Sequence, residues 1–350
     1  MRRVCVSITA RPSYSRIKSA LAALKQHDVE LQIIAAASAT VTRFGRIADQ
    51  IRADGFEVTA EVSSVVEEDS LANSALSTGV LLTQMAGTLQ RLKPDVVVTI
   101  ADRHETLATA IAASYQHIPL VHVQGGEVTG SIDDKVRNAI TQLADEHYVS
   151  TRLAALRVSR MKPGARVTVT GCPSIDLAIN TRVLLPRSGI VVVQHPVTNE
   201  ADLAGSQMRV TISALSGLSG VRYFWPGEDS GGSVMAKELR SAKVRPTRNL
   251  PSGDFLSLVS AAQCVVGNSS VGIRECSYFG TPVVNIGTRQ EGRERAENVV
   301  DVPHSLDAIR EAVERQVAHG PYPQSTLYGD GHAGERIAAL LAGKRAERAA

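Results

Sequence analysis

Short apolar runs alternate with helix-like patterns along most of the chain, and this alternation limits the fold more than any other feature of the sequence. In the first half the strand-like runs are 4–8, 31–37, 96–100, 120–123 and 167–169, and the helix-like segments are 17–24, 44–53, 76–92, 106–115 and 132–143. Strands that alternate with helices are typical of a parallel sheet, whose ligands gather outside the carboxyl ends of the strands.

A second alternating series begins at Ile190, after a segment at 186–189 that has the composition of a linker. Its strand-like runs are 190–193, 221–225, 263–266 and 282–286, and its helical patterns are 201–216, 233–242, 254–262 and 270–279. A chain of 350 residues is long enough for two full cores. We therefore predict two Rossmann-like α/β domains at 1–172 and 189–330, a helix and linker at 173–188, and a C-terminal helix within 331–350.

The composition points to a small ligand rather than a macromolecule. The net charge is only +3 and aromatic residues make up 4%, which argues against nucleic acid and against a membrane surface as partners. The four cysteines show no CxxC spacing, so we expect buried free thiols and no metal site. No signal-peptide pattern or membrane-spanning apolar run is evident, and we expect a cytoplasmic protein.

One stretch of the second half, 265–275, has the pattern of a phosphate site. A glycine and Asn268 turn the chain after a strand, and Ser269 and Ser270 open a helix. We expect the first amides of that helix to lack internal partners, and such amides bind phosphate. Glu275 could accept hydrogen bonds from sugar hydroxyls. A serine-capped helix without any ligand explains the same residues.

Polar side chains directly follow the predicted strands of the first half, where an α/β fold exposes its functional groups. Arg11 follows the first strand and could hold a diphosphate. The remaining candidates are Asp102, which opens an Asp-Arg-His-Glu run, Gln124 and Glu127, which flank paired glycines, and Asp133 and Arg137, which stand four apart on a helix. Helix caps, solvated first turns and a surface ion pair are the ordinary explanations of these residues.

Two further candidates lie in the second half. His195 follows the strand at 190–193, and an imidazole with a pKa near neutrality can donate a proton to a phosphate leaving group. Arg289 lies in a charged loop at 288–295 that either closes over an anion or is simply solvated. Each signal is weak alone. Together they predict a site in the crevice between the two domains.

The segment 329–334 fits the GxGxxG pattern of dinucleotide-binding loops. It does not follow an apolar strand, and too little chain remains after it to complete a βαβ unit. We therefore expect no nicotinamide cofactor.

Six motifs, in order, resemble the UDP-N-acetylglucosamine 2-epimerases, above all the hydrolysing branch that serves sialic acid synthesis. They lie at 11–18, 102–105, 125–133, 171–176, 267–270 and 287–290, and the match runs from residue 1 to about 302. The resemblance implies a fold of the glycosyltransferase-B type, with two Rossmann-like domains facing across a cleft. It also implies a homodimer, a UDP-sugar substrate, and no metal or other cofactor.

The resemblance implies roles for single residues as well. Arg11, Ser269 and Ser270 would bind the diphosphate, Glu275 the ribose, and His195 the leaving phosphate. Asp102 and Asp133 match acid–base positions of the family, and Arg137 and Arg289 match substrate-contacting arginines. Gln124, directly before the motif at 125–133, and Asn268, within the motif at 267–270, are expected to contact the substrate, and Glu127 adds a carboxylate to the acid–base set.

In this family UDP is lost first, which gives a 2-acetamidoglucal intermediate, and C2 is then reprotonated on its opposite face. That route requires charge stabilisation at the diphosphate and acid–base groups on both faces of C2. The sequence departs from the family at Gln124, where a glutamate is usual, at Ala101, where a glycine is usual, and at 36–39, which lack a histidine. Whether UDP-N-acetylmannosamine or free N-acetylmannosamine is released therefore stays open, as do the substituents at C4 and C6.

Two other functions fit part of the pattern. A glycosyltransferase of the same fold would use the phosphate site and His195 equally well, but it does not need acid–base groups on both faces of C2. A non-catalytic sugar-nucleotide binder would explain Gln124. The epimerase explains the whole motif set.

Overall fold

We describe a computed structural model of the chain over residues 1–42, 45–66, 70–130, 132–183, 185–227, 229–247 and 250–343. It divides into two compact units. Unit 1 comprises Met1–Glu127, Asp133–Asp176 and the segment that starts at Gly329, and unit 2 comprises Val128–Ile132 and Leu177–Tyr328. These limits differ from the expected ones, because the first unit continues to Asp176 and also includes the C-terminal helix.

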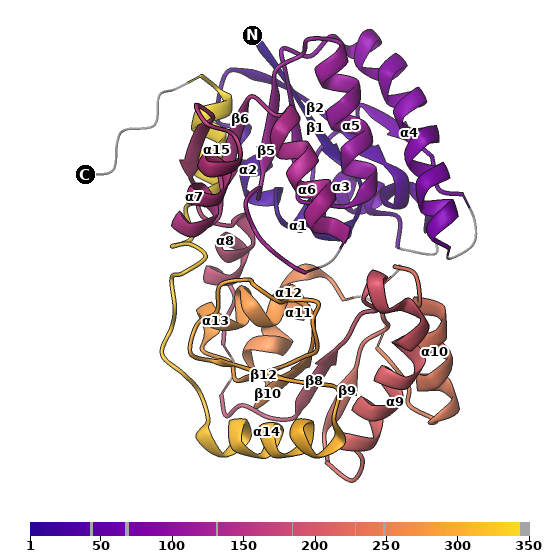
Figure 1. The fold of residues 1–350 in the computed structure, drawn as a ribbon. Helices are drawn as coiled ribbons and strands as arrows, with labels where there is room; N and C mark the ends of the chain where they lie inside the picture. The colour runs from indigo at the N-terminus through magenta and orange to yellow at the C-terminus, as the bar shows by residue number, and fades with distance from the viewer. Residues whose placement is uncertain are drawn as a thin grey trace. The chain divides into compact units, whose positions relative to one another are not determined.

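Unit 1 is built on seven strands in the order β3-β2-β1-β4-β5-β6-β7, paired in parallel (Figure 1). The strands are β1 (Arg2–Ile8), β2 (Val29–Ala36), β3 (Ala60–Val62), β4 (Val96–Ile100), β5 (Leu120–Val123), β6 (Glu146–Val149) and β7 (Arg166–Val169). The order reverses between β1 and β4, and ligands of such sheets bind at the carboxyl ends of the strands at this point.

Helices cover both faces of this sheet because successive strand residues point to opposite sides. Val4 and Val6 pack on the face that is covered by α2, α3 and α15, whereas Cys5 packs on the face covered by α4, α5 and α6. The helices of unit 1 are α1 (Arg11–Ser15), α2 (Lys18–Leu24), α3 (Ile47–Ala53), α4 (Leu71–Leu92), α5 (His104–Tyr115), α6 (Ile132–Leu143), α7 (Arg152–Met161) and α15 (Ala333–Leu341). Helix α8 (Pro173–Ile179) begins in unit 1 and ends in unit 2.

The C-terminal helix α15 lies beside α2 (Figure 1). A side chain at Gly334 would come within 2.6 Å of the Ser19 backbone, so glycine permits the close approach of the two helices. The Asp176 carboxylate accepts hydrogen bonds from the N–H groups of Ala333 (3.1 Å) and Gly334 (2.6 Å) and from the Ser19 hydroxyl (2.8 Å). Part of the GxGxxG pattern at 329–334 is therefore explained by helix packing.

Unit 2 has five parallel strands in the order β12-β11-β10-β8-β9, with helices on both faces. Its strands are β8 (Ile190–Val193), β9 (Val221–Tyr223), β10 (Cys264–Gly267), β11 (Val283–Ile286) and β12 (Val299–Val302). Its helices are α9 (Ala204–Ala214), α10 (Gly232–Ser241), α11 (Ser252–Ser260), α12 (Ser270–Ile273), α13 (Glu275–Phe279) and α14 (Leu306–His319). Here the order reverses between β8 and β10.

The predicted alternation is confirmed in both units, with local differences. The single helix expected at 270–279 is two short helices, α12 and α13, which meet at the buried residue Arg274 (φ −98°, ψ −73°). Strands β3, β6 and β12 and helices α1, α7 and α14 were not predicted. The start of the helix expected at 44–53 lies outside the described residues. None of the helices in the described ranges combines the length and the hydropathy needed to cross a membrane.

Candidate active site

In unit 1 the chain leaves the sheet through left-handed turns at the ends of β4 and β5, which carry several of the candidate residues. Ala101, directly after β4, has φ 66°, and Gln124, directly after β5, has φ 69°. Such values are uncommon for residues other than glycine. The turn at Ala101 places Asp102 beyond the carboxyl end of β4, next to the point where the strand order reverses.

Arg137 of α6 is the centre of the unit 1 cluster. Its side chain is fully buried, and its guanidinium pairs with the carboxylates of Asp102 and Asp134 and donates to the Glu127 carbonyl (2.6 Å). Burial lowers the pKa of Arg137, but the charges of Asp102, Glu127 and Asp134 outweigh burial and hold that pKa above its usual value. Arg137 is therefore a buried cation that fixes two acidic side chains and the main-chain carbonyl of Glu127, not the exposed partner of a surface pair.

Gln124 is held inside the same unit, with 2% of its surface exposed. Its Nε2 donates to Cys172 Sγ (2.9 Å), and Cys172 Sγ lies 3.0 Å from Ser174 Oγ. Its Oε1 is buried and has no hydrogen-bond partner within the described ranges. A buried acceptor without a protein partner is costly, so this oxygen is suited to accept a hydrogen bond from a ligand or water.

The other unit 1 candidates lie at the same edge of the sheet. Glu127 is buried (6% exposed), Asp133 is half-buried in the first turn of α6, and Arg11 is half-buried at the start of α1. The structure thus brings Asp102, Glu127 and Arg137 together directly. Asp134 was missed at the sequence level, although it lies three residues before Arg137 and this spacing faces one side of a helix.

In unit 2, Asn268 links the ends of β8 and β10, where the strand order reverses. Its Oδ1 accepts from the His195 N–H (2.7 Å), and its Nδ2 donates to the His195 carbonyl (2.8 Å). Its own carbonyl accepts from Arg289 Nη1 (3.2 Å) and Gln290 Nε2 (2.8 Å). Fully buried Asn268 therefore holds His195 and the loop that carries Arg289 in fixed positions.

The ring of His195 is held in one tautomer. The Gly227 N–H donates to Nδ1 (2.8 Å), so the neutral ring carries its proton on Nε2. Burial and then the positive charge of Arg289 lower the pKa of His195 to about 3. The expected pKa near neutrality is wrong for this structure, because the imidazole is desolvated beside a cation. His195 is a neutral Nε2–H donor.

The expectation that the first amides after Ser269 lack internal hydrogen-bond partners is wrong for Val271 and Gly272. The Val271 N–H bonds to Ser269 Oγ (3.5 Å) and the Gly272 N–H to the Ser269 carbonyl (3.1 Å), because α12 is only one turn long. The half-buried side chains of Ser269 and Ser270 lie at its start, and Glu275 opens α13.

The charged loop at 288–295 is folded onto unit 2. Gln290 (1% exposed) and Arg293 (6%) are buried in it. Arg289 is partly buried, with Nη2 3.8 Å from an Asp229 carboxylate oxygen. Unit 2 therefore brings His195, Asn268 and Arg289 together, with the Asp229 carboxylate beside them.

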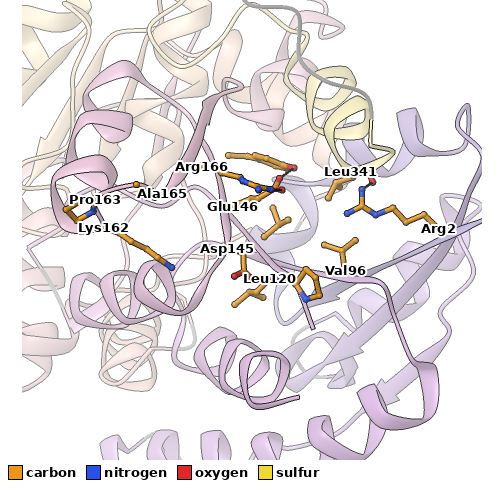
Figure 2. A pocket seen from close by; sticks show the side chains of 14 residues that line it. Arg2, Val96, Leu120, Asp145, Glu146, Lys162, Pro163, Ala165, Arg166 and Leu341 are labelled. Carbon is orange, nitrogen blue, oxygen red and sulfur yellow. Dashed lines mark hydrogen bonds and ion pairs between the residues drawn. The ribbon is translucent and has the colours of Figure 1, made fainter. Parts of the chain in front are cut away.

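Unit 1 also has a cavity of about 530 Å³ (Figure 2). It lies at the amino ends of the strands, opposite the edge that carries the candidate residues. It is lined by the first residues of β4 to β7. Lys162 Nζ donates to the carbonyls at 142 and 144 at the end of α6 (2.9 and 2.6 Å), and Arg2 donates to the Leu341 carbonyl at the end of α15 (2.8 Å). These charges cap helices. Within the described ranges, no group of three or more His, Cys, Asp or Glu residues is placed to hold a metal ion.

The comparison with known families decides which family these residues belong to. A model of the UDP-N-acetylglucosamine 2-epimerase family matches residues 22–342. The chain belongs to this family. The epimerase is 30% identical to the UDP-N,N'-diacetylbacillosamine 2-epimerase (hydrolyzing) of Legionella pneumophila, over 97% of this chain and 96% of that protein. It is 25% identical to the UDP-N-acetylglucosamine 2-epimerase of Neisseria meningitidis, over 95% and 92%.

Solved structures share the fold of the epimerase. The crystal structure of UDP-GlcNAc 2-epimerase from Neisseria meningitidis bound to UDP-GlcNAc superimposes with a TM-score of 0.80 at 17% identity, covering 98% of this chain and all of that chain (100%). The Methanocaldococcus jannaschii enzyme in complex with UDP-GlcNAc and UDP gives 0.81 at 16% identity, covering 97% and 99%. The predicted glycosyltransferase-B type of architecture is thus confirmed at the level of the fold, and the chain is an enzyme of this family.

Proposed function

We propose that this epimerase inverts C2 of a UDP-activated 2-acetamido sugar, with UDP-N-acetylglucosamine as the reference substrate, and that it does so by eliminating UDP. The observation that carries the proposal is the buried Arg137 that gathers the carboxylates of Asp102 and Asp134 at the carboxyl edge of unit 1. A glycosyltransferase does not need this acid–base cluster at C2. The family match supports the same reaction.

The residues of unit 2 are suited to the diphosphate of the substrate. His195 presents a neutral Nε2–H, and the negative charge of a phosphate beside it would raise the pKa of the ring. Arg289 supplies a fixed positive charge, and Ser269 and Ser270 supply hydroxyl donors. We propose that these groups, with Arg11 of unit 1, stabilise the charge that develops as UDP leaves. Glu275 would bind the ribose hydroxyls.

The carboxylates of unit 1 are proposed to move the C2 proton. Inversion needs one group to remove a proton and another to deliver one to the opposite face. Asp102, Asp133 and Glu127 are the candidates. Gln124 cannot transfer a proton, and its buried Oε1 instead suits an N–H or O–H group of the sugar.

The identity of the sugar is a second question. The Legionella pneumophila relative is named for a diacetamido sugar and for hydrolysis. We therefore propose UDP-N-acetylglucosamine and a UDP-2,4-diacetamido sugar as the two substrates to compare. Release of the free N-acetylmannosamine-type sugar plus UDP is one outcome, and release of UDP-N-acetylmannosamine is the other. We also propose that the enzyme is cytoplasmic and that it is a homodimer. Light scattering with the full chain would check the dimer.

Proton NMR in deuterated water tests the reaction. Each UDP-sugar is incubated with the enzyme without any acceptor, and we expect the C2 proton signal to disappear as deuterium is incorporated. Asp102→Asn should slow this exchange by about 100-fold or more, because general acid–base groups contribute factors of this size. The spectrum also shows whether the product retains UDP. Absence of exchange and of product with both sugars would refute the proposal.

A further inference from the structure

The turn that carries Asp102 depends on an unusual backbone carbonyl. The Ala101 N–H still donates to the Val123 carbonyl (2.9 Å), as in the sheet. The left-handed conformation of Ala101 (φ 66°) then turns its own carbonyl away from the strand ladder. That carbonyl lies 2.9 Å from Nε2 of His122, a residue of β5.

The contacts of His122 define its protonation. A carbonyl oxygen only accepts, so Nε2 carries the proton and donates it to Ala101. Nδ1 is then an acceptor, and the Thr141 hydroxyl lies 3.3 Å from it. Both side chains are fully buried. Burial lowers the pKa of His122 to about 4, so the ring is neutral at physiological pH.

The same imidazole contacts the two other segments of the cluster. A Cβ at Gly125 would lie 3.0 Å from His122 Nδ1 and 3.2 Å from Thr141 Oγ1, so the ring fills the space that this glycine leaves. Thr141 lies one helical turn after Arg137 on α6. His122 therefore touches the turn before Asp102, the paired-glycine turn and the helix that carries Arg137.

We propose that His122 is a positioning residue for the epimerase reaction. By holding the Ala101 carbonyl, its Nε2–H fixes the direction in which the Asp102 carboxylate leaves the sheet and keeps that carboxylate against Arg137. The inference rests on the proposed function, because it assumes that Asp102 acts at C2. A histidine that merely fills the core would affect stability without a specific effect on turnover.

Two substitutions and one control separate these possibilities. His122→Leu removes the donor, whereas His122→Gln keeps an N–H at nearly the same reach. His147→Leu is the matched control, because His147 is also fully buried in unit 1, with its ring centroid 6.4 Å from that of His122. The readouts are kcat and KM for C2 exchange, the dissociation constant of UDP, and the melting temperature.

We expect His122→Leu to lower kcat by about tenfold or more while KM and UDP affinity change by less than about threefold. His122→Gln should recover most of the kcat, and His147→Leu should keep kcat within about twofold of wild type. If His122→Leu does not fold, His122→Asn replaces it, because the shorter amide does not reach Ala101.

The outcomes that overturn the inference are specific. They are a kcat within about twofold of wild type when the donor is lost, or a folded His122→Gln that is no more active than the variants without the donor. Wild-type enzyme without any C2 exchange would instead refute the proposed function itself, and this measurement comes first.

Discussion

At the scale of single residues, a fully buried polar side chain organises the candidate residues of each unit. Arg137 does so through ion pairs in unit 1, and Asn268 does so through hydrogen bonds in unit 2. Burying an arginine or an asparagine is unfavourable unless its polar atoms find partners. Removing either one leaves its partners unpaired, which costs more than the interaction itself contributed.

Asn268→Ala should therefore weaken UDP binding. The change leaves the N–H and carbonyl of His195 without their partners and loosens the ends of β8 and β10. We expect a loss of about tenfold or more in UDP affinity, and about 1–3 kcal/mol in unfolding free energy for the groups left unsatisfied. Isothermal calorimetry and denaturant unfolding measure the two quantities.

Asn298→Ala is the matched control. Asn298 is equally buried in unit 2, but its Nδ2 donates to the Thr281 carbonyl (2.8 Å), away from His195. It should lower stability similarly and leave UDP affinity within about twofold. Equal losses of affinity in both variants would contradict the assigned role of Asn268.

Strand-end positions were predictable from sequence, but their contacts were not. Asp102, Gln124 and His195 directly follow apolar runs, and parallel strands expose such residues. Arg137 stands four residues after Asp133, a spacing that predicts a surface pair, yet its buried guanidinium pairs with Asp134 and with Asp102 from a distant segment. The low pKa of His195 results from burial and from Arg289, and neither is visible in a linear pattern.

At the scale of elements, the helices and strands that were not predicted differ in the strength of their sequence signal. Helix α14 follows a Ser305 cap and repeats apolar residues at Ile309 and Val313, so its signal was present in the sequence. Strand β6 reads Glu-His-Tyr-Val and has few apolar residues. It is a strand because β5 and β7 flank it and provide hydrogen bonds on both sides.

The packing of α15 on α2 predicts opposite effects for two helical glycines. Gly334→Ala should destabilise the protein by about 1–3 kcal/mol, because the new methyl group meets backbone atoms of Ser19 and Ala20 within 2.7 Å. Gly79→Ala in α4 should stabilise it by about 0.5–1 kcal/mol, because nothing lies within 4 Å and alanine favours the helix. Denaturant unfolding measures both, and a neutral Gly334→Ala would contradict the close approach.

At the scale of the whole molecule, four histidines have pKa values below the usual 6.5, namely His122, His147, His195 and His304. Burial is the largest cause in each case, and the values are about 4 for His122, about 4 for His147 and about 3 for His195. The unfolded chain therefore binds more protons than the folded protein once the pH falls below about 6.5. Stability from these groups is complete above that pH and is lost as the pH falls toward their folded-state values.

We accordingly expect the unfolding free energy to decrease between pH 6.5 and pH 4. The slope should approach about 1.4 kcal/mol per pH unit for each fully buried histidine. Denaturant unfolding at a series of pH values measures this slope, and His147→Leu should make it shallower. A stability that stays constant from pH 7 to pH 5 would show that the histidines titrate normally.

The placement of α15 has a consequence for the order in which the protein is made on the ribosome. Residues Leu21 and Leu24 of α2 are covered in part by Ile337 and Leu341, which are translated more than 300 residues later. All of unit 2 is synthesised before then. Since domains fold as they emerge from the ribosome, unit 2 can fold before unit 1 is complete. Until α15 has been synthesised, the apolar face of α2 that it covers stays exposed.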